Sequence, residues 1–272
     1  MYFSFSIGKK CESISTQIHI RMTYTLRSFC ITFAYLKNNK VKEEIKHIFF
    51  DLDRTLWDFE KSAEQTFVEI YENNKLFEKG IPSVKEFDSA YTIHNNKLWD
   101  QYRKGEIKKE VLRGLRFSLT LKDFGIVDEE LGEKIGDDYV RISPLKVNLF
   151  PYSIEILKYL FPLYSLHIIT NGFSEVQETK LKVSGMDKYF IEIITSEEAG
   201  VKKPHPDIFK FSFEKTGALA HESIMIGDDY DVDIIGAKDV GMKQIFFDPE
   251  NKLGKNGSTF HISCLKEIEE IL

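Results

Sequence analysis

The stretch Ile45-Lys46-His47-Ile48-Phe49-Phe50 runs directly into Asp51-Leu52-Asp53. A short, largely apolar run of this kind is typical of a strand that is buried in a sheet. The abrupt change to acidic residues marks the carboxyl end of that strand. We therefore predict a buried strand over residues 45–50, with Asp51 and Asp53 at its carboxyl end.

Three later runs have the same apolar character, and helical patterns such as Ser153–Phe161 and Ser174–Gly185 lie between the runs. Strands that alternate with helices are typical of a parallel, doubly wound α/β sheet, whose ligands bind beyond the carboxyl ends of the strands. This α/β fold class is therefore the one we predict. The three runs are Leu166–Ile169, Ser223–Ile226 and Gln244–Phe247.

The segment over residues 61–143 differs, because it holds helix-length patterns and no convincing strand. We predict that it is an inserted helical domain, and that residues 43–60 and 144–272 together form the sheet domain. The helical patterns are Ala63–Tyr71, Val84–Tyr102, Lys109–Leu121 and Glu129–Val140.

Residues 1–42 show no clean helical or strand period and no motif. We expect this segment to be a poorly ordered N-terminal extension, or translation to begin downstream of Met1, for example at Met22.

The composition excludes several classes of protein. The 272 residues include 37 basic and 43 acidic ones, and the net charge of −6 argues against a nucleic-acid partner. No stretch approaches the roughly 18 apolar residues of a membrane span. Cys11, Cys30 and Cys264 match neither a zinc site nor a disulfide framework. We expect a cytoplasmic, reduced protein that acts on a small molecule.

Acidic residues follow two of the predicted strands. Asp51 and Asp53 are two residues apart, so their side chains share a face if the strand continues. Two close carboxylates repel each other unless a cation or a proton lies between them, and Mg2+ prefers oxygen ligands. A second acidic cluster could complete such a site. It comprises Asp228, Asp229, Asp231 and Asp233.

Groups that suit a phosphate follow the other strands. Thr170 offers a hydroxyl, and the turn through Asn171 and Gly172 offers backbone amides at the start of a helix. Lys203, just before Pro204, supplies a positive charge. Each signal is weak alone, but their occurrence at successive strand ends predicts a phosphate site beside the acids.

Four stretches of the chain resemble the four motifs of the haloacid dehalogenase-like hydrolase superfamily, in the same order. The resemblance covers residues 45–272 and implies a Rossmann-like core with a small helical cap. One departure is Arg54, which stands where many members carry glycine. The four stretches are Asp51–Leu56, Ile169–Gly172, Val201–Phe209 and Gly227–Ala237.

The resemblance implies a Mg2+-dependent phosphatase. Asp51 is then the nucleophile that forms an aspartyl-phosphate, and a carboxylate suits this role because it is already ionised at neutral pH. Asp53 is the general acid and base. Asp51, the backbone carbonyl of Asp53, and Asp228 are the implied ligands of Mg2+. Thr170, Asn171 and the catalytic Lys203 are implied to bind the phosphoryl group. Asp233 is implied to orient Lys203 or metal-bound water.

A finer resemblance, to the noncanonical pyrimidine 5′-nucleotidase branch, implies that nucleoside 5′-monophosphates are the substrates. Trp57 and Trp99 could stack on a base, although buried packing is the commoner role of tryptophan. The stretches that carry this resemblance are Trp57–Phe59, His94–Ile107, Thr170–Phe173 and Thr259–Ile268.

Two alternatives stay open, namely a phosphatase of another small metabolite such as a sugar phosphate, and a sugar phosphomutase. Both share Asp51 and Asp53. A dehalogenase is disfavoured because it needs no acid at Asp53, and a receiver domain because it has no helical insertion. A catalytically inactive binding protein is disfavoured because every chemical position is filled.

Overall fold

The computed structural model describes residues 42–252 and 257–272. The chain divides into two compact units, of which Ile45–Glu269 contains the sheet. The other unit comprises Met1–Glu44 and Glu270–Leu272, and most of it is outside the described residues. The predicted extension therefore lies outside them except for Lys42, and so do Met22, Cys11 and Cys30.

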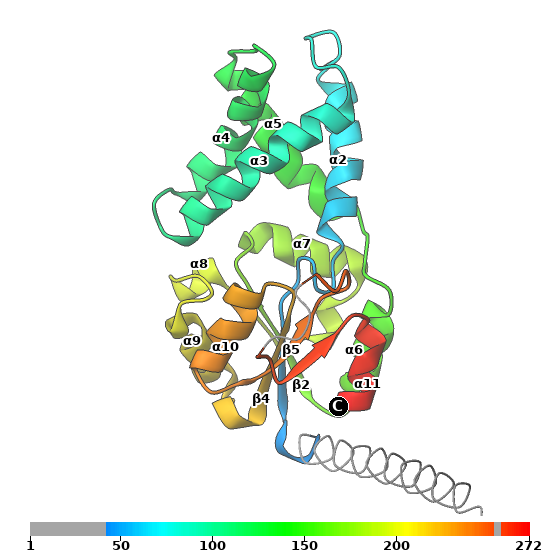
Figure 1. The fold of residues 1–272 in the computed structure, drawn as a ribbon, viewed down its shortest axis with the longest axis vertical. Coiled ribbons are helices and arrows are strands. Elements are labelled where there is room, and N and C mark those ends of the chain that lie inside the picture. Colours follow the sequence, from blue (N-terminus) through cyan, green and yellow to red (C-terminus); the bar gives the residue numbers. More distant parts are fainter. Residues whose placement is uncertain (1–41, 253–256) are drawn as a thin grey trace, which may run out of the picture. The chain divides into compact units, whose positions relative to one another are not determined.

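The described sheet has six strands, all parallel, in the order β3-β2-β1-β4-β5-β6 (Figure 1). This arrangement confirms the predicted α/β class. Four of the strands match the predicted runs to within two residues, and the short edge strands β3 and β6 are additional. The strands are β1 (His47–Phe50), β2 (Ser165–Thr170), β3 (Glu192–Thr195), β4 (Ser223–Gly227), β5 (Lys243–Phe247) and β6 (Phe260–Ile262).

Helices cover both faces of the sheet, with α9 and α10 on one side and α6 on the other in Figure 1. The helices are α2 (Phe59–Asn73), α3 (Val84–Arg103), α4 (Lys109–Asp123), α5 (Glu129–Ile142), α6 (Ser153–Leu160), α7 (Ser174–Ser184), α8 (Ser196–Ala199), α9 (Pro206–Thr216), α10 (Gly236–Asp239) and α11 (Ile268–Ile271). Short helical turns are η1 (Ser143–Leu145), η2 (Asp187–Tyr189), η3 (Ala220–Glu222), η4 (Tyr230–Ile235) and η5 (Leu265–Glu267).

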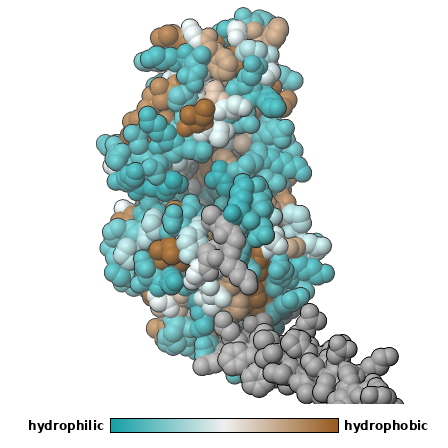
Figure 2. Space-filling model, viewed as in Figure 1, coloured by the Kyte–Doolittle hydropathy of each residue, from teal (hydrophilic) through white to brown (hydrophobic). Residues whose placement is uncertain are grey.

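The central strand β1 explains why its sequence is a continuous apolar run. Ile48, Phe49 and Phe50 are all fully buried, because helices cover both faces of the sheet. Among the described residues, no helix combines the length and the apolar character that a bilayer crossing requires. Hydrophilic residues also predominate on the face shown in Figure 2.

Helices α2 to α5, which we call the helical insert, have an apolar core of their own. Each of the four predicted helices is present, and α2 begins at Phe59, where the Asp58 side chain caps it by accepting a hydrogen bond from the Lys61 amide. Aromatic rings fill the insert, and Phe67 contacts the rings of Phe87 and Tyr91 edge-on. Whether the insert acts as a separate cap domain stays a prediction.

Candidate active site

The carboxyl ends of three strands bring the predicted site together. In the register of the sheet, Phe50 pairs with Ile168 on β2 and with Ile226 on β4. Residues that follow these positions therefore meet at one edge of the sheet, beside a cavity of about 390 Å³. Every residue predicted for the site lines this cavity, namely Asp51, Asp53, Thr170, Asn171, Lys203, Asp228 and Asp233.

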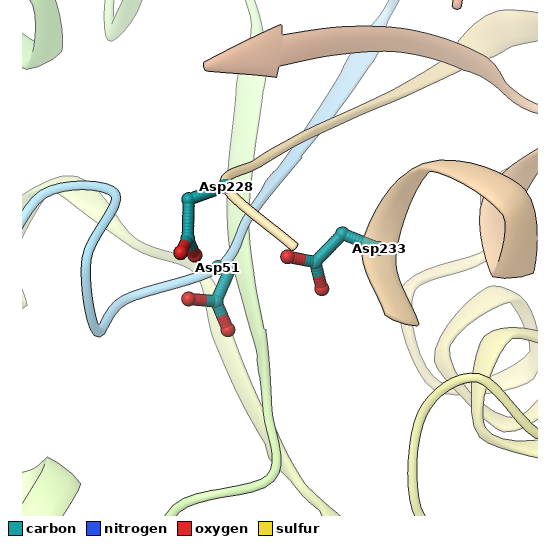
Figure 3. Close-up of side chains that lie close together, drawn as sticks. All are labelled: Asp51, Asp228 and Asp233. Atoms are coloured by element: carbon teal, nitrogen blue, oxygen red, sulfur yellow. The ribbon is translucent and has the colours of Figure 1, made fainter. Parts of the chain in front are cut away.

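Three carboxylates form a tight acidic cluster in this cavity. Oxygen atoms of Asp51, Asp228 and Asp233 all lie within 4.8 Å of one another, and Figure 3 shows the three side chains converging. Lys203 is buried among them, and its Nζ donates hydrogen bonds to Asp51 Oδ1 at 2.6 Å and to Asp233 Oδ1 at 2.7 Å. With all four groups ionised, the cluster carries a formal charge of about −2.

The pKa values reflect this excess of negative charge. The pKa of Asp51 is raised to about 7, because burial and the carboxylate of Asp233 raise it by more than Lys203 lowers it. Burial also raises the pKa of Asp228, and the carboxylates of Asp51 and Asp233 add to this effect. Burial alone would lower the pKa of Lys203, but the carboxylates of Asp233 and Asp51 raise it, so the ammonium form is stable.

A divalent cation fits this cluster. Its donors are carboxylate oxygens, which Mg2+ prefers, and a charge of +2 would balance the surplus of about two negative charges. Asp233 is the least available ligand, because its Oδ1 accepts from Lys203 and its Oδ2 accepts from the Asp229 amide at 3.2 Å. Asp233 thus contacts Lys203 directly, and its predicted role in orienting that side chain stays a prediction.

Thr170 and Asn171 use their side chains in different ways. Thr170 Oγ1 accepts hydrogen bonds from the Gly172 amide at 3.0 Å and from Gln177 Nε2 at 2.7 Å, which leaves its own proton to be donated elsewhere. The Asn171 side chain instead braces the backbone of Lys203, because its Nδ2 donates to the Lys203 carbonyl at 2.9 Å and its Oδ1 accepts from the Lys203 amide at 2.8 Å. The Asn171 backbone amide is thus a donor that this side-chain contact leaves available to a phosphate, and Nδ2 keeps a second proton.

The other acids of the second cluster have local roles. Asp229 caps η4, since its Oδ1 accepts from the amides of Asp231 at 3.2 Å and Val232 at 3.1 Å. Asp231 is exposed. Arg54 adopts a φ of 64°, in the left-handed region that glycine enters without strain, so a glycine would suit this position.

The helical insert supplies part of the cavity wall. Phe59 of α2 and four residues of α3 line it. Trp99 stacks on Phe173 with ring centroids 5.6 Å apart, whereas Trp57 is fully buried and does not line the cavity. The two tryptophans therefore differ, because Trp57 only packs and Trp99 can reach a ligand. The α3 residues are Asn95, Asn96, Trp99 and Arg103.

Two residues at the site were missed by sequence reasoning. Gln177 and Lys180 of α7 are buried, and both donate hydrogen bonds to the carboxylate of Asp53. No sequence signal singled them out, because their burial is apparent only in the structure, where the buried positions of α7 are these two polar residues and Leu181.

Comparisons with known proteins agree with this geometry. YfnB of Bacillus subtilis, a HAD-hydrolase with a crystal structure bound to magnesium, is 26% identical with a TM-score of 0.76, over 84% of this chain and 99% of that chain. Pyrimidine 5′-nucleotidase YjjG of Escherichia coli K12 is 28% identical over 83% of this chain and 96% of its own. A glyceraldehyde 3-phosphate phosphatase of Pyrococcus abyssi is 34% identical over 75% of this chain and 81% of its own.

The sequence profile of the haloacid dehalogenase-like hydrolases matches residues 45–241, a range that contains the whole acidic cluster, Lys203 and the helical insert. The protein is thus a member of the haloacid dehalogenase-like hydrolase family.

Proposed function

We propose that this protein is a Mg2+-dependent phosphomonoesterase that works through an aspartyl-phosphate on Asp51. The observation that carries the proposal is the position of the Asp51 carboxylate. It lines the cavity, 2.6 Å from the Lys203 ammonium, and the proton of the Thr170 hydroxyl is available nearby. This arrangement combines a nucleophile with donors for phosphoryl oxygens.

In the first half of the reaction, an oxygen of Asp51 attacks phosphorus and forms a P–O bond. The bond from phosphorus to the leaving oxygen breaks, and that oxygen takes a proton from the Asp53 carboxyl group. Lys203 and Thr170 bind the transferring phosphoryl oxygens, together with backbone amides of the turn after β2.

In the second half, the Asp53 carboxylate takes a proton from a water molecule, whose oxygen attacks phosphorus. The bond between phosphorus and Asp51 breaks, inorganic phosphate leaves, and both carboxyl groups return to their initial protonation states. Mg2+, held by Asp51, Asp228 and the backbone carbonyl of Asp53, would supply positive charge that offsets repulsion between the anionic nucleophile and the anionic substrate.

The proposed substrate class is nucleoside 5′-monophosphates, with pyrimidine nucleotides preferred. The similarity to YjjG, whose name is pyrimidine 5′-nucleotidase, supports this assignment. The cavity wall also offers the rings of Phe59 and Trp99 for stacking and the amides of Asn95 and Asn96 for hydrogen bonds. Such contacts distinguish bases by about 1–3 kcal/mol, so we expect a preference with measurable activity on other phosphate esters.

A second candidate class is small sugar phosphates. It is supported by the 34% identity to the protein of Pyrococcus abyssi that is named glyceraldehyde 3-phosphate phosphatase. The reaction centre is the same for both classes, because it handles only the phosphoryl group.

The test is a phosphate-release screen with Mg2+, in which kcat/KM is compared for UMP, dUMP, dTMP, AMP, glucose 6-phosphate and glyceraldehyde 3-phosphate. The Asp51→Asn variant serves as the blank for contaminating phosphatases. We expect a pyrimidine nucleotide to have the highest kcat/KM. A sugar phosphate whose kcat/KM exceeds that of every nucleotide would reject the nucleotidase assignment. If none of the esters releases phosphate, the phosphatase assignment is rejected.

A further inference from the structure

Asp53 lies in the wall between two cavities. It lines the 390 Å³ cavity that holds Asp51 and Lys203, and it also lines a smaller cavity of about 50 Å³. Gln177 and Lys180 line only the smaller cavity. Any effect of these two residues on a substrate in the larger cavity must therefore pass through Asp53 or another residue of the wall.

The two α7 residues occupy both oxygens of the Asp53 carboxylate. Lys180 Nζ donates a hydrogen bond to Oδ1, and Gln177 Nε2 donates to Oδ2 at 2.8 Å. The two residues are one helical turn apart, so the donors lie on the same face of α7. The carboxylate is thereby held in one orientation from behind, while a quarter of the Asp53 side chain stays exposed.

The Lys180 ammonium is buried, at a cost in free energy. Its side chain is only 4% exposed, and its ammonium lies over the rings of Trp57 at 5.4 Å and Phe59 at 5.9 Å. Burial of an ammonium costs several kcal/mol unless a partner compensates it. Among the described residues, the hydrogen-bond acceptor for this ammonium is Asp53.

Gln177 connects Asp53 to the phosphate-binding side of the cavity. Its Nε2 also donates to Thr170 Oγ1 at 2.7 Å, which helps to turn the proton of the Thr170 hydroxyl away from α7. Gly172 leaves room for this contact, because a Cβ atom at that position would lie 2.2 Å from Gln177 Nε2. The turn after β2 is therefore shaped around the Gln177 side chain.

We propose that Lys180 and Gln177 are positioning residues, which hold the Asp53 carboxyl group where the leaving oxygen receives its proton. This inference rests on the proposed function. A positioning role differs from a purely structural role in one respect. If Lys180 positions Asp53, its loss impairs the departure of leaving groups that need a proton and spares the departure of leaving groups that do not.

The experiment compares two substrates in the full-length protein with Mg2+. One is the best alkyl phosphate of the screen above, whose alkoxide needs protonation. The other is 2,4-dinitrophenyl phosphate, whose phenolate leaves without a proton. The parameter is kcat/KM, which reports only the steps up to departure of the leaving group. The variants are Lys180→Met, Lys180→Arg and Gln177→Met, and the control is Lys182→Met, because Lys182 is exposed on the same helix and pairs with Glu178.

For Lys180→Met we expect kcat/KM to fall by about 10²-fold with the alkyl phosphate and by less than about 3-fold with the dinitrophenyl ester. Lys180→Arg should recover part of the loss, and Lys182→Met should match the wild type. Gln177→Met should also raise KM for both substrates, because Thr170 loses a donor.

Equal losses of Lys180→Met on the two substrates, or full activity on both, would overturn the inference and leave the phosphatase assignment intact. If Lys180→Met does not fold, as judged by circular dichroism, Gln177→Met carries the same comparison of the two substrates. A wild type that hydrolyses neither ester overturns the proposed function and this inference with it.

Discussion

At the scale of single residues, Asp51 and Asp53 are two positions apart but face different partners. Asp51 is hydrogen-bonded to Lys203 in the acidic cluster, whereas Asp53 is hydrogen-bonded to Gln177 and Lys180 of α7. Burial works against ionisation of Asp51, whereas Lys203 beside it, together with a bound divalent cation, would favour the ionised form that a nucleophile needs. Asp53, in separate surroundings, would exchange protons with the leaving oxygen.

This difference predicts distinct effects of two substitutions. Asp51→Asn should abolish phosphate release, because an amide is not a competent nucleophile. Asp53→Asn should lower kcat by about 10²-fold or more, since general acid catalysis typically contributes that much. The measurement is steady-state phosphate release, with circular dichroism as the control for folding. Turnover of Asp51→Asn at the wild-type rate would contradict the covalent mechanism.

At the scale of elements, Phe173 joins α7 to the helical insert. It immediately precedes α7 and is 4% exposed, in an apolar cluster with residues of α3 and α4. Lys109 of α4 lies over the same ring and forms ion pairs with Glu175 of α7 and Glu197 of α8. The ring of Phe173 thus packs where the insert meets the sheet layer, and it supports Trp99 at the cavity wall.

We expect Phe173→Ala to lower the free energy of unfolding by about 3 kcal/mol, because it removes a buried ring. KM should rise by about 5-fold, since an aromatic pair contributes about 1 kcal/mol and Trp99 loses its support. Urea unfolding and Michaelis kinetics measure the two effects. Phe161→Ala is the matched control, because that ring is 50% exposed, and an equal effect there would refute the argument.

Strands β1 and β2 carry a stacked pair of histidines, which are not part of the candidate site. The rings of His47 and His167 have centroids 5.4 Å apart, and His167 is 1% exposed. Burial, together with the neighbouring His47, lowers the pKa of His167 to about 4. The folded protein therefore resists protonation of a group that the unfolded chain protonates near pH 6.5.

The sign of the pH dependence follows from this lowered pKa. The contribution of His167 to stability is fully present above about pH 6.5 and is lost as the pH falls toward 4, by about 2 kcal/mol at pH 5. In the wild type, the free energy of unfolding should therefore fall between pH 6.5 and pH 5, and we expect the His167→Leu variant to lose the part of this fall that His167 contributes. Urea unfolding at each pH measures the free energy of unfolding. Subtracting the variant's values from those of the wild type removes the contribution of the acidic cluster, which both proteins share. His221→Gln is the control, since that side chain is 75% exposed, and an unchanged slope in His167→Leu would contradict the assignment.

At the scale of the whole molecule, the acidic cluster links stability to metal binding. The buried Asp51 and Asp233 and the partly buried Asp228 lie beside one ammonium, that of Lys203, so the folded protein carries a local surplus of negative charge that the unfolded chain does not have. A cation that binds only the folded state then stabilises the entire fold.

We expect Mg2+ at 100 times its Kd to raise the free energy of unfolding by about 2.7 kcal/mol, and Tm by about 2–4 °C for each kcal/mol. Thermal denaturation with and without Mg2+ measures this shift, and phosphate release should vanish after chelation and return with Mg2+. Asp228→Asn should lose the shift, whereas Asp231→Asn, at an exposed position in the same segment, should keep it. Equal shifts in both variants would place the metal elsewhere.

The sequence by itself determined the central strands and where most residues of the candidate site lie. Strands β1, β2 and β4 are buried on both faces, so their apolar runs stand out, and a parallel sheet necessarily brings their carboxyl ends together. The positions of Asp51, Thr170 and Asp228 follow from this geometry alone. Strands β3 and β6 were missed because they lie at the edges of the sheet, where only part of each strand is buried, so neither sequence forms a continuous apolar run.

Only the tertiary structure decided what the side chains around these positions do. Asp53 meets Gln177 and Lys180 across 124 and 127 residues of sequence, and no local pattern encodes such a contact. The same holds for Trp57 and Trp99, since one is enclosed by the core and the other faces the cavity. Strand ends are set by local hydrophobicity, whereas the partners of a buried polar group depend on which distant helix packs against it.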